Sequence, residues 1–172
     1  IWIVYNGGIA IFDERTENFI TGSIQSAFSL ANNLGITVHP IVHFQNDTML
    51  IGSWYAGLQK VFINGDTIST ILFPDENETN PRRHIVSGIS RGTGSQWWAG
   101  TYGNGIAWFD VHTNKFTAHF YHDPSDAKSL SDNYVKDVFT DASGIVWIGT
   151  AKGLDKFDPL TQKEFYRFAA FF

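Results

Sequence analysis

One stretch of sequence recurs along the chain at a nearly constant spacing. Its last copy, residues 146–158, reads VWIGTAKGLDKFD, in which two apolar runs flank an Ala-Lys break, as in two β-strands joined by a tight turn. The aligned first residues of the four copies are Trp2, Leu50, Trp98 and Trp147, so the steps are 48, 48 and 49 residues. A constant period in this range is typical of solenoids, propellers and other repeat arrays.

Each repeat predicts four short strands, which we call A to D. In the last repeat, strand B is VWIGT and strand C is GLDKF. The four expected ranges in that repeat are 134–140, 146–150, 153–157 and 165–169. Turns are predicted after strands A and C, at residues 141–144 and 158–161, since both stretches begin with Asp and since Asp, Ser and Gly favour turn geometry.

The other repeats divide in the same way. The third predicts strands at 84–90, 96–101, 105–109 and 116–121, and the second predicts strands at 36–44, 49–53, 57–63 and 67–73. The first repeat contains strands B, C and D only, because the chain starts at Ile1 inside the pattern. The best helix candidate, residues 23–32, is confined to one loop of one repeat.

Four short strands per repeat of this length indicate a β-propeller. We therefore expect an all-β propeller fragment of about four blades, each with four antiparallel strands, in which the first blade lacks its first strand. Within a single propeller segment, the expected blades are 1–35 (partial), 36–83, 84–133 and 134–172. A β-solenoid is the alternative, although its coils are usually shorter and carry one or two strands.

The residues that repeat have structural explanations. The Trp that opens strand B is large and apolar, so we expect it to fill the space between adjacent blades. The Asp that ends strand C, at Asp13, Asp110 and Asp158, can cap the turn that follows it. Trp97 precedes the repeated Trp98 and points to the opposite side of its strand, which fits either a core or an interface position.

Composition excludes several classes of function. The formal net charge of −5 argues against nucleic acid as a partner and against electrostatic docking on anionic membranes, since both need a basic surface. The chain has no cysteine, so it can form neither a disulfide framework nor a thiolate zinc site. No apolar run approaches the length that crosses a bilayer, and no signal-peptide pattern is present.

Residues 141–165 resemble the two-component regulator propeller repeat, whose pattern runs roughly Asp-x-x-Gly-x-Leu-Trp-Ile-Gly-Thr-x-x-Gly-Leu-x-x-Phe-Asp-x-x-Thr-x-x-Phe. The third repeat follows the pattern closely, whereas the second has Leu50 for Trp and Ser53 for Thr. The resemblance implies the periplasmic sensor region of a hybrid two-component histidine kinase and response regulator. Such regulators are common in gut Bacteroidetes, where many control polysaccharide use.

The resemblance also implies a seven-bladed ring followed by a β-sandwich, a membrane helix and a histidine kinase. None of these later parts is in this sequence, so we expect no enzymatic activity from this segment. Since a ring needs four to eight closed blades, we expect a piece of a longer polypeptide that is completed by its remaining blades or by a second copy in a homodimer. A lone four-bladed ring is the alternative.

Candidate binding residues lie in the loops that join strands B and C and in the linkers between repeats, because both fall on one face of the disc. Long loops on a rigid scaffold commonly carry binding residues. The candidates are Trp54, Tyr55, Arg82, Arg83, Tyr102 and Asn104. Aromatic side chains such as Trp54 and Tyr55 suit sugar rings, and paired arginines suit a carboxylate or sulfate. The alternative is that the aromatic pair packs against the next blade and the arginines are solvated.

Catalytic motifs are absent from the sequence. His39 and His43 share one face of a predicted strand and would need a third ligand to hold a metal. We therefore expect no catalytic residue, no metal and no cofactor. The functional hypothesis is a periplasmic ligand-sensing propeller segment of a two-component regulator, with a small molecule or an oligosaccharide as its ligand. The alternatives are a protein-interaction scaffold and a metal-dependent propeller lyase.

Overall fold

The structure is a computed structural model that describes residues 1–5, 8–20, 38–53, 57–64, 67–72, 85–161 and 164–169. Within these residues, regular secondary structure consists of strands, which form four antiparallel sheets. The predicted all-β class is therefore confirmed. The helix candidate at 23–32 lies outside the described residues.

The four sheets follow one another along the sequence, and we call them blades 1 to 4. Blade 1 has β1 (Trp2–Tyr5), β2 (Gly8–Asp13) and β3 (Asn18–Ile20). Blade 2 has β4 (Val38–Gln45), β5 (Thr48–Ser53), β6 (Gly57–Asn64) and β7 (Thr67–Leu72). Blade 3 has β8 (Val86–Arg91), β9 (Gln96–Thr101), β10 (Ile106–Asp110) and β11 (Lys115–Phe120). Blade 4 has β12 (Val135–Thr140), β13 (Val146–Thr150), β14 (Gly153–Phe157) and β15 (Phe165–Ala169).

Each blade is an antiparallel meander, in which every strand pairs with the one that follows it. The predicted bounds of strands B, C and D in the last repeat agree with β13, β14 and β15, and the other predicted ends differ by at most two residues. Differences of this size are usual at strand ends, where pairing frays. Among the described residues, blade 1 has the three strands that the sequence predicts as B, C and D.

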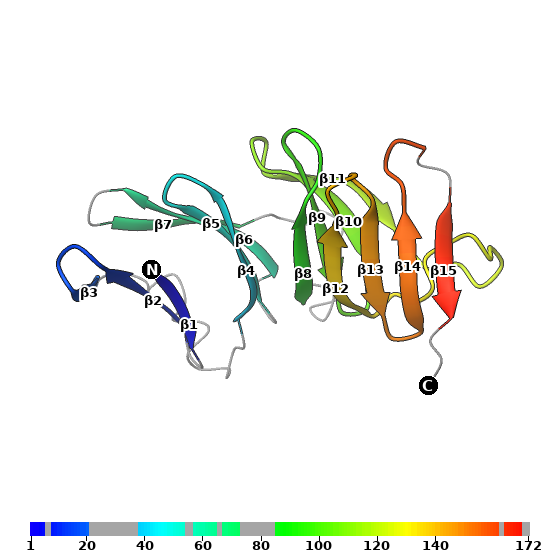
Figure 1. Ribbon diagram of the computed structural model, residues 1–172, viewed down its shortest axis with the longest axis horizontal. Helices are drawn as coiled ribbons and strands as arrows, with labels where there is room; N and C mark the ends of the chain where they lie inside the picture. Colours follow the sequence, from blue (N-terminus) through cyan, green and yellow to red (C-terminus); the bar gives the residue numbers. More distant parts are fainter. Residues whose placement is uncertain are drawn as a thin grey trace.

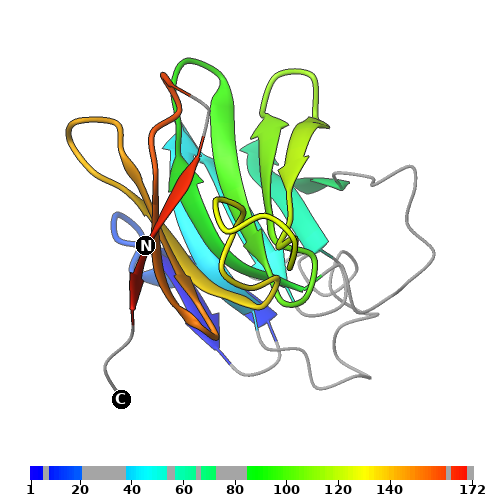
Figure 2. The ribbon, with the colours of Figure 1, turned by 90° about the vertical axis from the view of Figure 1, so that its right-hand side faces the viewer.

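The blades stand in a row in sequence order (Figure 1). The first strands of blades 2, 3 and 4 lie side by side, since β4 contacts β8 and β8 contacts β12. Blades 1 and 4 lie at opposite ends of the row, and Figure 2 views the molecule from the blade 4 end. The described strands thus form an open arc of a propeller.

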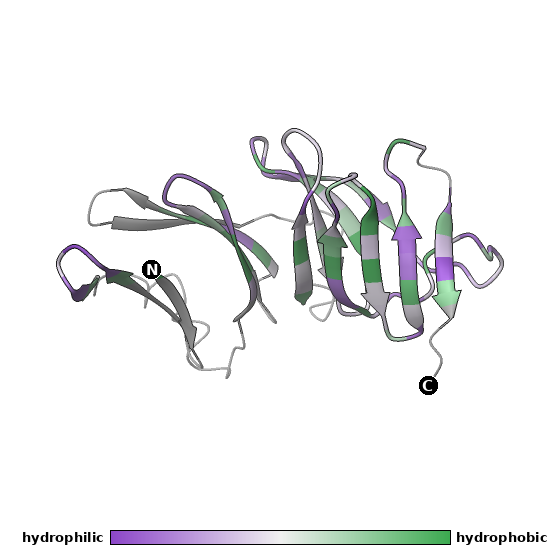
Figure 3. Ribbon diagram, viewed as in Figure 1, coloured by the Kyte–Doolittle hydropathy of each residue, from purple (hydrophilic) through white to green (hydrophobic). Residues whose placement is uncertain are grey.

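The apolar core between blades 3 and 4 is built around Trp98, whose side chain is fully buried. Its ring centroid lies 5.5 Å from that of Phe157, which belongs to the neighbouring blade. The buried members of this cluster are Trp98, Ile106, Leu130, Val135, Val138, Val146, Ile148, Phe157 and Phe165. The apolar character of β13 beside the more polar β14 is visible in Figure 3. The expected role of the repeated Trp as a filler between blades is therefore confirmed at Trp98.

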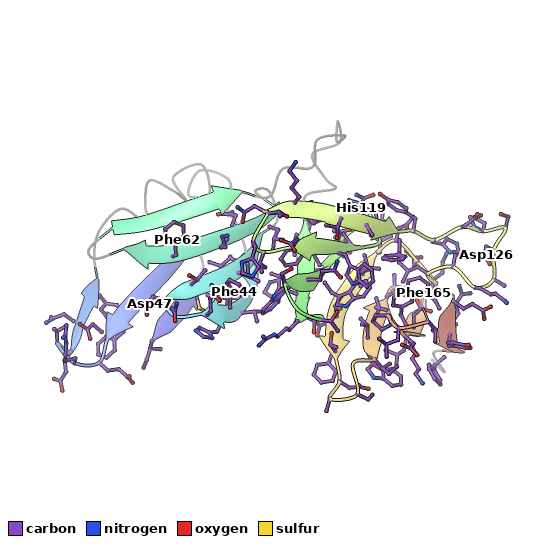
Figure 4. All side chains as sticks on the ribbon, turned by 90° about the horizontal axis from the view of Figure 1, so that it is seen from above. Phe44, Asp47, Phe62, His119, Asp126 and Phe165 are labelled. Carbon is purple, nitrogen blue, oxygen red and sulfur yellow. The ribbon has the colours of Figure 1, made fainter. Side chains whose placement is uncertain are left out.

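A second core joins blades 2 and 3. Trp97 is 2% exposed there, and its ring centroid lies 5.8 Å from that of Phe44, which Figure 4 labels. The buried members are Leu50, Leu58, Val86, Ile89, Trp97, Ala99, Phe109 and Val111. The side chains of the adjacent residues Trp97 and Trp98 thus pack on opposite faces of blade 3, because successive side chains of a strand point to opposite sides.

Two paired glycines let blade 4 approach blade 3 closely. Gly88 and Gly100 face each other across β8 and β9. A Cβ atom added at Gly88 would lie 2.6 Å from the backbone nitrogen of Val138, and one added at Gly100 would lie 2.5 Å from a methyl carbon of Val135. Both distances are shorter than van der Waals contact, so the side-chain-free surface of blade 3 is required for β12 to dock.

The repeated Asp residues cap their turns, as predicted. The Oδ1 atom of Asp110 accepts hydrogen bonds from the backbone nitrogens of His112 (2.9 Å) and Thr113 (2.7 Å), and Asp110 also accepts one from the Ser95 hydroxyl. These bonds favour the carboxylate form and lower the pKa of Asp110 to about 2. At Asp158, Oδ1 accepts the Leu160 backbone N–H at 2.9 Å.

A buried carboxylate lies in β14. Asp155 is fully buried, and its Oδ2 atom accepts the backbone N–H of Ser131 at 2.9 Å. Its Oδ1 atom lies 3.9 Å from the Arg167 Nε atom and has no hydrogen-bond partner among the described residues. Burial raises the pKa of Asp155 above its usual value, while the bonds from Ser131 and the charge of Arg167 act in the opposite direction.

The close packing at Gly88 predicts that Gly88→Ala destabilises the chain by about 1–3 kcal/mol, because the added methyl group forces β12 away from β8. The matched control is Gly149→Ala in blade 4, where the nearest atom to an added Cβ is the Asp137 carbonyl oxygen at 3.9 Å. Urea unfolding should show a loss in the first variant and none in the second, at a protein concentration too low for a second copy to cover the outer face of blade 4, on which Gly149 lies. Equal losses in both would contradict the close approach.

The raised pKa of Asp155 predicts a pH-dependent difference from the Asp155→Asn variant. Because the folded pKa exceeds the unfolded value, the contribution of Asp155 to stability is full below pH 3.8 and is lost as the pH rises through the folded pKa. The variant should therefore gain stability relative to the parent chain between acidic and neutral pH. Urea midpoints of both chains at several pH values test this. A variant whose midpoint falls relative to that of the parent chain as the pH rises would contradict it.

Candidate functional site

The B–C turn of blade 3 and the start of blade 4 form a cluster of Tyr102, Tyr134 and Lys136, which we call the tyrosine–lysine cluster. The two tyrosine rings lie edge to face with their centroids 5.1 Å apart. The Lys136 Nζ atom lies 4.3 Å from the centroid of the Tyr102 ring and donates to the Tyr102 hydroxyl at 3.1 Å. Tyr134 is 49% exposed, so the cluster presents an aromatic surface to solvent.

Backbone contacts hold this cluster in place. Tyr102 forms an isolated bridge with Tyr134, and its backbone nitrogen donates to the Ile85 carbonyl at 2.9 Å. Asp132 accepts the backbone N–H of Tyr134 at 2.8 Å and forms an ion pair with Lys152 at 3.2 Å. A half-exposed aromatic surface with nearby cationic and hydroxyl donors can pack against the C–H face of a sugar and bind its hydroxyls.

Asn104 lies in the same turn but is 5% exposed. Its backbone nitrogen donates to the Thr101 Oγ1 atom at 3.0 Å. The flanking nitrogens of Gly103 and Gly105 both donate to the Asn133 carbonyl at 3.0 Å, which ties the turn to the linker before blade 4. In this conformation Asn104 offers little surface to a ligand, whereas Tyr102 is half-buried and borders solvent.

The other candidate binding residues, Trp54, Tyr55, Arg82 and Arg83, lie outside the described residues. Their role in binding stays a prediction. His43 is described, and its Nε2 atom lies 2.7 Å from the Asn46 carbonyl oxygen. Among the described residues, no group of three His, Cys, Asp or Glu side chains is placed to hold a metal ion. Within the same residues, no helix is long and apolar enough to span a membrane.

The opposite end of the blades carries a groove that the sequence analysis did not assign. It lies between the A–B turns of blades 3 and 4 and has a volume of about 280 Å³. Both turns lie along the upper edge of the molecule in Figure 1. Its lining residues are Arg91, Gly92, Thr93, Trp98, Trp108, Thr140, Asp141, Ala142, Gly144 and Pro159. The rings of Trp98 and Trp108 lie 4.7 Å apart at its base.

Asp141 brings a fixed negative charge to one wall of this groove. Its Oδ1 atom accepts the backbone N–H of Ser143 (2.9 Å) and of Ile145 (3.1 Å), and its Oδ2 atom accepts the indole N–H of Trp147 (2.9 Å). The bonds from the Ser143 hydroxyl and from Trp147 are the main reasons that the pKa of Asp141 is lowered to about 2. The one sequence signal for the groove is a departure from the repeat, since Gly92 replaces this Asp in blade 3.

The outer face of blade 4 presents large apolar side chains to solvent. Phe139 is 61% exposed, Leu154 is 40% exposed and Phe168 is 48% exposed, and the Phe168 ring lies 5.7 Å from that of Trp147. Strand register places Leu154 opposite Phe168, as Ile106 lies opposite Phe120 in blade 3. Blade 4 therefore repeats on its free face the surface that blade 3 buries against its neighbour.

Comparison with known proteins finds similarity to bacterial regulators. A curated relative, histidine kinase P4 of Formosa agariphila, is 37% identical over 147 residues, which are 86% of this chain and 10% of the kinase. No protein-family model matches the chain. The chain thus spans about a tenth of the length of this relative.

Solved structures share the fold. The extracellular domain of the proposed hybrid two-component system BT3049 from B. thetaiotaomicron matches with a TM-score of 0.70 at 17% identity, over 97% of this chain and 21% of that chain. PorZ, a surface component of the type-IX secretion system of Porphyromonas gingivalis, matches with a TM-score of 0.70 at 14% identity, over 97% of this chain and 25% of that chain. The resemblance seen in the repeat is confirmed: the chain is a β-propeller segment similar to the extracellular domain of a hybrid two-component system and to part of a histidine kinase.

Proposed function

We propose that this chain is an extracytoplasmic ligand-sensing segment of a two-component regulator and that it resides in the periplasm. The observation that carries the proposal is the blade arrangement, which matches the extracellular domain of a hybrid two-component system over 97% of the chain. The similarity to a histidine kinase over 86% of the chain supports the same assignment. In this proposal the segment binds the ligand and transmits the signal, and catalysis belongs to other parts of the polypeptide.

An oligosaccharide or a small molecule with similar chemistry is the proposed ligand. The tyrosine–lysine cluster supports this choice, because Tyr102 and Tyr134 offer aromatic surface and Lys136 offers a cation beside it. These residues lie on the face where the sequence places Trp54 and Tyr55 of the preceding repeat. A ligand that spans two neighbouring blades could therefore contact aromatic residues from both.

The outer face of blade 4 is proposed to bind another propeller blade, either from the remaining blades of the same polypeptide or from a second copy of this chain. The argument is repetition, because Leu154 occupies the position that is fully buried at Ile106. Because Leu154 is exposed, apolar surface remains on blade 4 that another blade, with a first strand like β12, would cover. Ligand binding would then favour one arrangement of neighbouring blades or subunits over another. This shift would change the signal that the segment passes to the rest of the regulator.

The sensing proposal predicts that one saccharide from a glycan pool raises the melting temperature of the chain, since a ligand that binds the folded state stabilises it, by about 2.7 kcal/mol at a hundred times its Kd. Tyr134→Ala should remove most of this shift, because it deletes the exposed ring of the cluster. The matched control is Phe19→Ala, which removes an aromatic ring that is 53% exposed in blade 1, away from both the cluster and the outer face of blade 4. A pool without any stabilising saccharide, or an unchanged shift in Tyr134→Ala, would contradict the proposal.

A further inference from the structure

The linker between β11 and β12 ends in a segment, residues 130–133, that supports the tyrosine–lysine cluster. Asp132 accepts the backbone N–H of Tyr134 at 2.8 Å. The Asn133 carbonyl accepts two backbone N–H groups of the turn that carries Tyr102, both at 3.0 Å. The positions of both tyrosines in the cluster therefore depend on this segment.

The same segment lies on a buried carboxylate of blade 4. Leu130 and Ser131 are fully buried, and so is Asp155. The Asp155 Oδ2 atom accepts the Ser131 backbone N–H at 2.9 Å, and the Ser131 hydroxyl lies 2.6 Å from the Thr150 hydroxyl. Movement of the segment away from β14 would therefore expose the carboxylate to water.

A carboxylate at this position is not part of the repeat. Strand register places Ala107 of blade 3 where blade 4 has Asp155, since Ala107 pairs with Ala99 and Asp155 pairs with Ile148. Ala107 is buried, so a blade forms without a polar group at this position. The carboxylate in blade 4 therefore needs an explanation other than the architecture of a blade.

The charge of Asp155 is only partly balanced. Its Oδ1 atom is buried and has no hydrogen-bond partner among the described residues. Two groups favour its charged form, namely Arg167, whose Nε atom lies 3.9 Å away on β15, and His122 at the start of the linker. Burial of a carboxylate without full compensation is unfavourable.

The other elements that pack around Asp155 bring no unpaired charge from the described residues. On β13 the residue opposite it is Ile148, and Phe157 on the same side of β14 lies in the apolar core between blades 3 and 4. In the linker, Asp132 forms an ion pair with Lys152. Burial outweighs the nearby charges and raises the pKa of Asp155 above its usual value of 3.8. The closed segment thus binds a proton at Asp155 more strongly than an open one would.

We propose that Asp155 is a positioning residue whose proton keeps the segment 130–133 closed, so that release of this proton opens the segment and loosens the tyrosine–lysine cluster. By linkage, the advantage of the closed form is full below pH 3.8 and is lost as the pH rises through the raised pKa of Asp155. Weaker saccharide binding at higher pH is a consequence, and this consequence alone rests on the proposed function.

Amide hydrogen exchange of the full chain, measured without a saccharide from acidic to neutral pH, tests the proposal. After correction for the intrinsic pH dependence of exchange, the protection of the Tyr134 and Gly103 amides should fall as the pH rises. The fall is about tenfold per pH unit at most, the limit for release of one proton. The Val111 amide, which donates to the Ser95 carbonyl at the other end of blade 3, should keep its protection. Constant protection at Tyr134 and Gly103, or an equal loss at Val111, would overturn the proposal.

Three variants assign the effect to Asp155. Asp155→Asn keeps the shape of the side chain without its charge, so the protection of the cluster should not change with pH. Arg167→Gln removes a charge that favours the carboxylate, so the fall should begin at a higher pH than in the parent chain. The matched control is Asp126→Asn, an exposed Asp of the same linker, which should respond as the parent chain does. The assignment is wrong if Asp155→Asn shows the parental fall, if the fall in Arg167→Gln begins at an unchanged or lower pH, or if Asp126→Asn abolishes it.

Discussion

The structure depends on the packing of each blade against the first strand of the next. Between blades 3 and 4, Trp98 and its apolar neighbours meet β12 across a surface that Gly88 and Gly100 keep free of side chains. Such packing joins nearest neighbours, so stability in a repeat protein is approximately the sum of blade and interface contributions. A blade without a neighbour must therefore leave one apolar face exposed, and blade 4 does so at Phe139 and Phe168.

Differences between repeats carry more functional information than the repeated residues themselves. Within blade 4 the Trp147 indole N–H donates a hydrogen bond to Asp141, and this bond stabilises the fold of the blade. At the same position blade 3 keeps the tryptophan but has Gly92, which leaves a buried donor beside a groove. At the other end of the blades, Tyr102 and Lys136 come from different blades and meet because the B–C turn packs against the next first strand. The groove and the tyrosine–lysine cluster thus both lie at the junction between blades.

The sequence predicted the fold well because strand and turn signals are local and are repeated four times. The strand bounds of blade 4, the capping role of Asp110 and the burial of Trp98 all followed from the repeat. The sequence did not reveal the groove, because its walls come from turns about fifty residues apart, and only packing brings them together. It also could not distinguish Asn104, which is nearly buried, from Tyr102 in the same turn, since burial depends on the linker that precedes blade 4.

The central claim, that the outer face of blade 4 is an unfilled blade interface, is tested most directly by light-scattering mass of the chain in solution. The account predicts a mass above the 19.3 kDa of one chain, as a second copy covers the face, and a return to that value in Phe139→Lys. Leu160→Lys, at a residue 86% exposed in the C–D turn, is the control and should keep the larger mass. A mass of 19.3 kDa at every concentration for the unmodified chain would contradict the claim.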